Sequence, residues 1–164
     1  MAHTQAYKKI RVEREFVGKK FFLSRKDSRK LVNEEQVAGF LSSNFGYEKV
    51  YAEDLSVNEQ ISMFMHSDDI AAIHGAAIGP LLYRPKDSKT MSLLEIFSPG
   101  HMTNFYRGTS DQVGINWVGV RGRIKSNQIN EAYNFDKAYL KYSLSDFYAD
   151  LDSLERAVNF LKEI

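Results

Sequence analysis

The sequence contains no cysteine, which excludes disulfide bonds, thiolate metal ligands and a cysteine nucleophile. It also has no apolar run approaching the roughly 20 residues that a membrane-spanning helix needs. The N-terminus lacks the apolar core of a signal peptide. These absences predict a cytoplasmic protein with no transmembrane segment.

Several motifs of nucleotide and metal chemistry are missing as well. No Gly-x-Gly-x-x-Gly follows the first predicted strand, and no phosphate-binding loop ends in Gly-Lys-Ser/Thr. The four histidines, His3, His66, His74 and His101, do not have the spacing of metal ligands. Asp150-Leu151-Asp152 formally matches the Asp-x-Asp of metal-dependent glycosyl transfer, but it leads into the last predicted helix, where Asp152 or Ser153 is more simply a cap. We therefore expect no metal and no cofactor.

The net charge of +1 conceals an uneven distribution along the chain. Residues 1–30 hold ten Lys and Arg against three acidic residues, whereas the remaining residues hold 12 basic and 18 acidic ones. A basic arm of this kind can bind nucleic acid or an anionic lipid surface. Its basic residues form no patch interleaved with aromatic ones, which disfavours nucleic-acid binding. We interpret residues 1–18 as a basic N-terminal arm and residues 19–164 as one domain.

What the sequence does have is a regular alternation of short apolar runs and amphipathic segments. Helices are predicted to open at Asn33 and at Ser56, each with the spacing of a capping box, and the first of them is predicted to stop at Gly46. Further helices are expected over 76–83, 104–113 and 151–164. The runs at 20–24, 49–52, 70–73, 91–97 and 115–120 are apolar on both faces, which is typical of buried parallel strands. The pattern predicts an α/β fold: a Rossmann-like open parallel sheet with helices on both faces.

In such sheets ligands collect outside the carboxyl ends of the strands. Arg25 and Arg29 follow the first predicted strand, His74 and Gly75 follow the third, and Glu95 lies near the end of the fourth. Arginine side chains and a helix N-terminus suit a diphosphate, and a carboxylate suits sugar hydroxyls. The alternatives remain open: solvated arginines, a core-packed histidine in a tight turn, and a glutamate that pairs with an arginine.

Four motifs in order carry a resemblance to a known family. They are Ser24-Arg25 with Arg29 and Asn33-Glu34-Glu35, then Asp54-Leu55-Ser56 with Glu59-Gln60, then His74-Gly75-Ala76, and then Leu94-Glu95-Ile96-Phe97. With the C-terminal Asp150-Leu151-Asp152, these motifs resemble family 61 glycosyltransferases, the group that includes capsular-polysaccharide transferases. The resemblance runs from about Lys20 to the C-terminus.

The resemblance implies the C-terminal, nucleotide-sugar-binding domain of a GT-B enzyme that transfers sugar with inversion and without a metal. It implies that Arg25 and His74-Gly75-Ala76 lie at the diphosphate and that Glu95 lies near the ribose, with Arg29 as an additional candidate. The catalytic residue is not identified, although His74 is a candidate. The chain departs from the family pattern at Pro80, where relatives have an asparagine, and the loss of that side chain and of a backbone donor predicts weaker donor binding.

Two functions of different class follow. In the first, the chain is the donor-binding half of an inverting glycosyltransferase and works with a separate first domain or as a homo-oligomer. In the second, it is a non-catalytic Rossmann-like module for ligand binding or assembly. The first hypothesis predicts an exposed apolar surface around His74, Phe97, Phe105 and Tyr106, unless the helix over 151–164 covers that edge.

Overall fold

The computed structural model describes residues 16–86, 91–128 and 142–164. Its centre is a five-stranded, all-parallel sheet in the order β2-β1-β3-β4-β5. The strands are β1 (Lys20–Ser24), β2 (Tyr47–Tyr51), β3 (Asp69–Ile73), β4 (Ser92–Phe97) and β5 (Asn116–Arg121). The open parallel α/β sheet expected from the sequence is confirmed.

This strand order places the topological switch point between β1 and β3. Adjacent connections leave in opposite directions there, because β2 lies on one side of β1 while β3 and β4 lie on the other. Flavodoxin-like sheets of this order bind their ligand in the crevice at that point. The loops that follow β1 and β3 are therefore the first place to look for a site.

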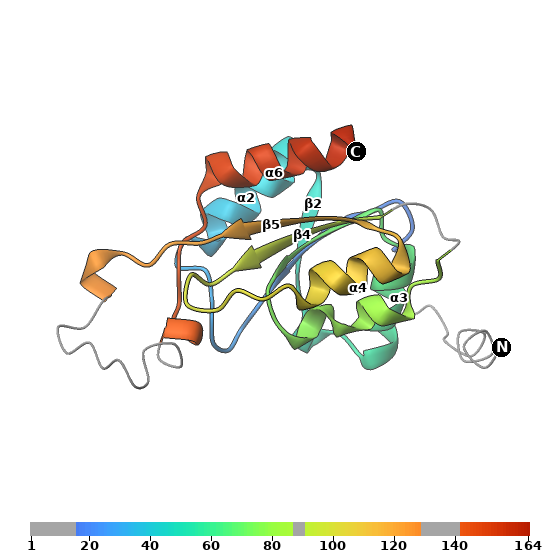
Figure 1. Ribbon diagram of the computed structural model, residues 1–164, viewed down its shortest axis with the longest axis horizontal. Helices are drawn as coiled ribbons and strands as arrows, with labels where there is room; N and C mark the ends of the chain where they lie inside the picture. Colours follow the sequence, from blue (N-terminus) through green and yellow to red (C-terminus); the bar gives the residue numbers. More distant parts are fainter. Residues whose placement is uncertain (1–15, 87–90, 129–141) are drawn as a thin grey trace.

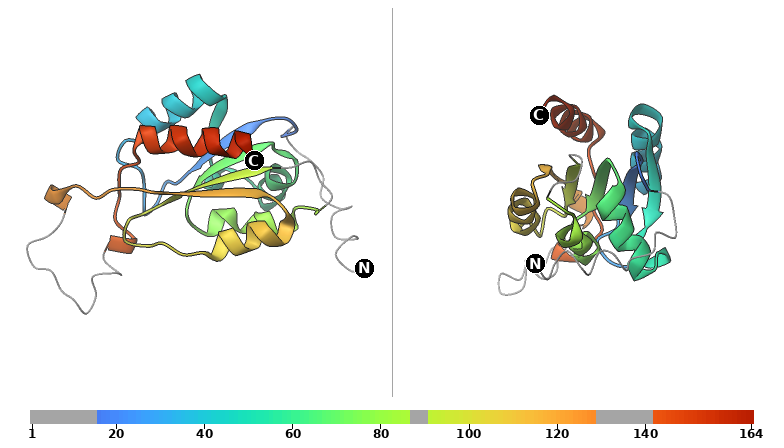
Figure 2. Two further views of the ribbon diagram at one scale, coloured as in Figure 1. Left: turned by 45° about the horizontal axis from the view of Figure 1, so that its top comes forward. Right: turned by 90° about the vertical axis from the view of Figure 1, so that its right-hand side faces the viewer.

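Helices cover both faces of the sheet (Figure 1). On one face lie α2 (Glu34–Phe45) and α6 (Leu151–Glu163), side by side in both Figure 1 and the left view of Figure 2. On the other lie α3 (Val57–His66), the 3-10 helix η3 (Ala76–Tyr83) and α4 (Phe105–Val113). Each face buries its own apolar cluster against the sheet.

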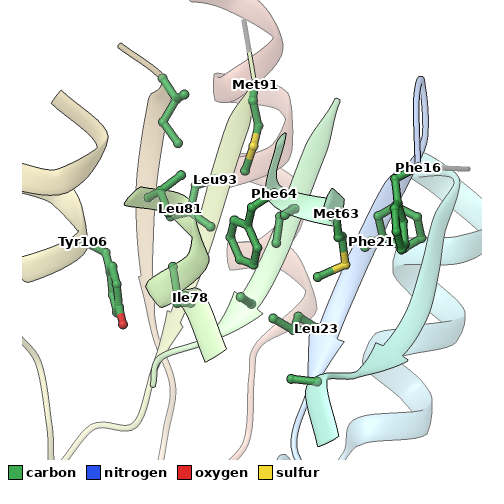
Figure 3. Packing of buried hydrophobic residues seen from close by; sticks show 14 of the residues in the cluster. Phe16, Phe21, Leu23, Met63, Phe64, Ile78, Leu81, Met91, Leu93 and Tyr106 are labelled. Atoms are coloured by element: carbon green, nitrogen blue, oxygen red, sulfur yellow. The ribbon is translucent and has the colours of Figure 1, made fainter. Parts of the chain in front are cut away.

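The cluster under α3, η3 and α4 is built from long aliphatic, methionine and aromatic side chains (Figure 3). Phe16 belongs to it, is 2% exposed and packs edge-on against Phe21 at 5.5 Å between ring centroids. The packed domain therefore includes Phe16, which the sequence places in the basic arm. Residues 1–15 of that arm lie outside the described residues.

The predicted helix boundaries are confirmed in part. Ser56 and Glu59 form a reciprocal capping box at the start of α3, and Gly46 ends α2 in the left-handed conformation with φ of 76°. The capping box predicted at Asn33 is wrong: its side chain makes no cap bond and instead bonds the main chain of Ala149 through both its amide nitrogen and its oxygen. A long-range contact has replaced the local one.

Two further predictions need correction. Helix α6 is capped by Asp150, whose carboxylate accepts from the Ser153 amide at 3.1 Å, and not by Asp152 or Ser153. The third predicted helix, η3, is of the 3-10 type, because Pro80 inside it has no N–H and its ring is incompatible with continued α-helical bonding.

The segment 142–150 runs along the carboxyl edge of the sheet before α6 begins (Figure 1). Its main chain bonds the loop after β1 through Arg29 and Lys30, and forms a bridge at Tyr148 with Arg123, just after β5. Phe147, fully buried, packs in the cluster under α2 and α6. This segment fixes the loop that carries the candidate arginines.

Candidate functional site

Arg25 lies between the loops that follow β1 and β3. Its Nη1 donates to the carbonyl of His74 at 3.2 Å. Its Nε and Nη2 pair with the Asp27 carboxylate at 3.0–3.1 Å. The Arg25 side chain is only 15% exposed, whereas Asp27 is 61% exposed. The Arg25 guanidinium holds the pKa of Asp27 below its usual value. The arginine is thus held at the switch point, and its acidic partner is an exposed carboxylate that an anionic ligand can replace.

Gly75 lets Arg25 come this close to the main chain. A Cβ at position 75 would lie 2.2 Å from an Arg25 guanidinium nitrogen. The Gly75 carbonyl accepts from the Tyr106 hydroxyl at 3.0 Å and from the Ile78 amide at 3.1 Å. Ile78 is therefore the first intrahelical donor of η3, and the preceding amides of Ala76 and Ala77 have no intrahelical acceptor. Ala76 is exposed, whereas Gly75 before it is buried.

Arg29 is the second arginine of the site, and its setting is unfavourable in three ways. Its φ of 59° lies in the left-handed region, which L-residues seldom adopt. Its Nε is buried and has no hydrogen-bond partner among the described residues. Burial, and then the neighbouring charge of Arg25, lower its pKa. Residues held in such conformations are concentrated at functional sites.

His74 and Glu95 form a close buried pair. His74 Nδ1 lies 2.5 Å from Glu95 Oε1, and the other carboxylate oxygen accepts from the Trp117 indole at 2.8 Å. Glu95 is fully buried and His74 is 7% exposed. Glu95 thus reaches the site through His74, and its predicted place near a ribose stays a prediction.

His101 extends the cluster at the carboxyl edge. Its ring lies 5.1 Å from that of His74, at an interplanar angle of 40°. Burial lowers the pKa of His101, and the nearby His74 and Arg29 lower it further. Two arginines after β1, Arg25 and Arg29, and two histidine rings, His74 after β3 and His101 after β4, are therefore close to one another at this edge.

The structure therefore brings Arg25, Arg29, His74, Gly75 and Ala76 to one edge of the sheet, as the sequence predicts. Sequence reasoning did not include His101 or Trp117 in the site, and it placed Tyr106 near His74 only as part of an exposed apolar surface. Nothing in the local sequence marks them as site residues, since each joins the site through a long-range contact. Two other strand-end serines have internal positions: Ser98 donates to the Tyr142 carbonyl, and Ser24 is fully buried.

The expected apolar surface is mostly wrong. His74, Phe97 and Tyr106 are 7%, 1% and 6% exposed, because they pack on one another beneath the edge; Phe105, at 58%, is exposed. The alternative cover is also wrong, since α6 lies on a face of the sheet beside α2. The carboxyl edge is crossed by the segment 142–150 instead.

Two features are absent from residues 16–86, 91–128 and 142–164. In this part of the chain no group of three or more His, Asp and Glu side chains is arranged to hold a metal ion. No helix there is both long enough and apolar enough to cross a membrane.

Comparison with known proteins gives a family match and a structural likeness. The family model described as Glycosyltransferase 61 matches residues 2–91, just over half of the 164-residue chain. This range includes Arg25, Arg29 and His74-Gly75-Ala76, and it ends before Glu95. No curated protein matches the sequence. Among solved structures, a diflavin flavoprotein A3 from Nostoc sp. is similar with a TM-score of 0.47 and 10% identity, covering 92% of this chain and 98% of that chain.

Proposed function

Because the chain belongs to the glycosyltransferase 61 family, we propose that the edge of its sheet at β1 and β3 binds the diphosphate of a nucleotide-sugar donor. The observation that carries this proposal is the convergence at the switch point of Arg25, Arg29 and the first amides of η3. Arginine offers phosphate oxygens two parallel donors, and backbone amides at a helix start offer more.

The setting of Arg29 supports an anionic ligand. A guanidinium that is partly desolvated beside another guanidinium is destabilised by both effects. A bound diphosphate would pair with both charges at once and would supply the missing acceptors. The Arg25 bonds to the exposed Asp27 would be exchanged for bonds to phosphate oxygens, while its bond to the His74 carbonyl is compatible with either state.

The reaction we propose is inverting transfer of the sugar to a hydroxyl acceptor, in glycan or polysaccharide synthesis, capsular polysaccharide included. In this proposal Arg25, Arg29 and the Ala76 and Ala77 amides neutralise the leaving diphosphate without a metal ion. Inverting transfer also needs a base for the acceptor hydroxyl. In the GT-B arrangement this base comes from a facing domain or from the cleft. We propose that the reaction takes place in the cytoplasm. The facing partner is a first domain or a second copy of the chain.

A nucleotide panel tests donor binding. We expect one of UDP, GDP, CDP or TDP to raise the melting temperature of the protein, since a ligand at 100 times its dissociation constant stabilises by about 2.7 kcal/mol. The substitution Arg25→Ala should weaken binding of that nucleotide by about 1.5–3 kcal/mol, the scale of a hydrogen bond to a charged group. Lys26→Ala is the matched control, because Lys26 is the adjacent cation and pairs with Asp54 outside the site.

Unchanged affinity of Arg25→Ala in a calorimetric titration would contradict the proposed site. If Arg25→Ala instead unfolds the domain, the arginine serves the fold through its bonds to His74 and Asp27. Diphosphate binding without transfer from any donor, even with a facing partner supplied, would favour the non-catalytic module.

A further inference from the structure

The pair His74 and Glu95 belongs to a longer chain of contacts that crosses three strands. Along β4, Leu94 and Ile96 point into the cluster under α2 and α6, so Glu95 points to the opposite face, toward α3, η3 and α4. Trp117 of β5 packs on that same face. His74 follows directly after β3, so one row of contacts runs from the half-buried Trp117 through the buried Glu95 to His74.

Space for this row is provided by a glycine. Gly119 of β5 is the register partner of Glu95, and a Cβ at that position would lie 2.8 Å from the Trp117 indole and 3.0 Å from the Phe97 ring. The absence of a side chain there lets the indole lie across β5 and reach the carboxylate. The row is therefore built into the packing of the sheet face.

The donors and acceptors of the row determine where protons lie. The indole Nε1 can only donate, so Glu95 Oε2 must accept. A fully buried carboxylate is costly unless its other oxygen also receives a hydrogen bond. Among the described residues the group that contacts this oxygen is His74 Nδ1, which carries the proton when the carboxylate is ionised. His74 Nε2 has no hydrogen-bond partner among the described residues.

We propose that Glu95, held by Trp117, is a positioning residue for His74: it keeps a proton on Nδ1, so that Nε2 is the ring nitrogen that meets a bound diphosphate. The identity of the ligand rests on the proposed function. To bind a phosphate oxygen, Nε2 must donate, so the ring carries both protons in the complex and Glu95 balances its charge.

The surroundings of His74 fit this role. Phe97 stacks on the ring at 5.1 Å and 22°, and Tyr106 packs edge-on at 5.8 Å, so the ring is fixed from two sides. The charged and titratable groups around it are Glu95 on β4, His101 after β4, Tyr106 on α4, and Arg25 and Arg29 after β1. Arg25 and Arg29 are cations, and Asp27, the acidic partner of Arg25, is 61% exposed, which suits an anion at Nε2.

The first test needs no ligand. The proton position on the His74 ring is measured by nitrogen NMR of histidine-labelled protein at a pH where the ring is neutral, with the signal assigned by its loss in His74→Gln. We expect the proton on Nδ1. In Glu95→Gln, the amide oxygen accepts from Trp117 and the amide nitrogen faces Nδ1, so the ring proton should move to Nε2. The same tautomer in both proteins, or Nε2–H in the wild type, overturns the positioning role.

A second variant guards against misfolding of Glu95→Gln. Gly119→Ala displaces the indole and leaves both members of the pair chemically intact. We expect a mixture of the two tautomers there, because the carboxylate loses one of its two fixed bonds. An unchanged, single Nδ1–H tautomer in Gly119→Ala would show that Trp117 has no part in positioning.

The second test uses inorganic pyrophosphate in calorimetric titrations of the whole chain. His74→Gln should weaken pyrophosphate binding about 10-fold or more, the scale of one hydrogen bond to a charged group. Glu95→Gln should weaken it as well, because its ring can still donate from Nε2 but no longer has the carboxylate that balances a ring carrying both protons. The double variant should bind like His74→Gln alone, because Glu95 acts only through His74. Equal weakening by Glu95→Gln in both backgrounds, or none in either, overturns the inference. If the wild type does not bind pyrophosphate or any nucleotide diphosphate, the proposed function fails, while the tautomer measurement still decides the role of Glu95.

Discussion

The Arg25 guanidinium occupies the space that a side chain at Gly75 would need. The distance from its nearest nitrogen to a Cβ built on Gly75 is 2.2 Å, which no real contact allows. The glycine backbone itself is extended, with φ of 164°, so a larger residue could adopt its conformation. What requires glycine at this position is the arginine and its bond to the His74 carbonyl.

Gly75→Ala should therefore weaken nucleotide-diphosphate binding and leave the fold intact. The added methyl group forces the end of a flexible side chain to move and does not strain the main chain, so we expect a stability loss below about 1 kcal/mol. Affinity should fall toward that of Arg25→Ala, measured by calorimetric titration. Gly79→Ala is the matched control, because a Cβ at Gly79 meets nothing within 4 Å. Equal affinities of Gly75→Ala and wild type would show that the Arg25 position does not matter for binding.

Binding of the diphosphate should persist in excess chelator. The site we propose neutralises phosphate with arginine and backbone amides, which no chelator removes. The measurement is the thermal shift produced by the nucleotide with and without chelator, and then with added magnesium or manganese. A shift that vanishes with chelator and returns with either metal would contradict metal-independent binding and would bring Asp150 and Asp152 back as candidate ligands.

Substitutions of Asp150 and Asp152 distinguish a helix-capping role from a metal-binding role. Asp150→Ala removes the α6 cap and should lower the free energy of unfolding by about 1 kcal/mol, whereas Asp152→Ala, in the exposed first turn, should change it by only a few tenths. The bond from Ser153 lowers the pKa of Asp150, so its stabilising effect is full above the usual aspartate pKa of about 3.9 and is lost as the pH falls through the lowered value.

Urea unfolding of both variants at pH 7 and pH 3 measures this difference, which should shrink at the lower pH. Neither substitution should change nucleotide affinity. A stability loss of Asp150→Ala that is the same at both pH values would show that the ionised carboxylate is not the capping group.

The sheet, its parallel strands and the edge that carries the site could be predicted because they depend on local patterns. Runs apolar on both faces identify the strands, and the position of Arg25 and His74 directly after two of them places both at the carboxyl edge. The α2 cap was mispredicted because Asn33 bonds Ala149, 116 residues away, and local spacing cannot report such a partner.

The candidate site likewise contains residues that local sequence patterns indicate and residues that only long-range packing brings together. The placement of Arg25 and His74 at one edge could be predicted from the sequence, but the burial of Glu95 against Trp117 could not, because it depends on strand register and on the space above Gly119. The predicted exposure of Phe97 and Tyr106 was wrong for a related reason. Their rings pack around His74, and an apolar residue near a strand end does not reveal by itself whether a neighbour covers it.

Arg29 provides the test that best separates function from stability. Its left-handed backbone costs about 1 kcal/mol for a residue with a Cβ, and its guanidinium is partly desolvated next to Arg25. Arg29→Gly relieves both effects and keeps the main-chain bond from residue 29 to the Leu144 carbonyl. Glycine also gains conformational freedom in the unfolded chain, so we expect the free energy of unfolding to change by less than about 1 kcal/mol in either direction.

Affinity for the nucleotide diphosphate should nevertheless fall by about 1.5 kcal/mol or more, because a charged donor is lost. Arg29→Lys is the matched control: it keeps the charge and the backbone strain, so its stability should equal that of the wild type and its affinity should lie between the two. Chemical unfolding and calorimetric titration of the three proteins give both quantities. If Arg29→Gly destabilises the domain by several kcal/mol and binds the diphosphate normally, Arg29 is a structural residue, and the strained turn after β1 serves only to join it to the segment 142–150.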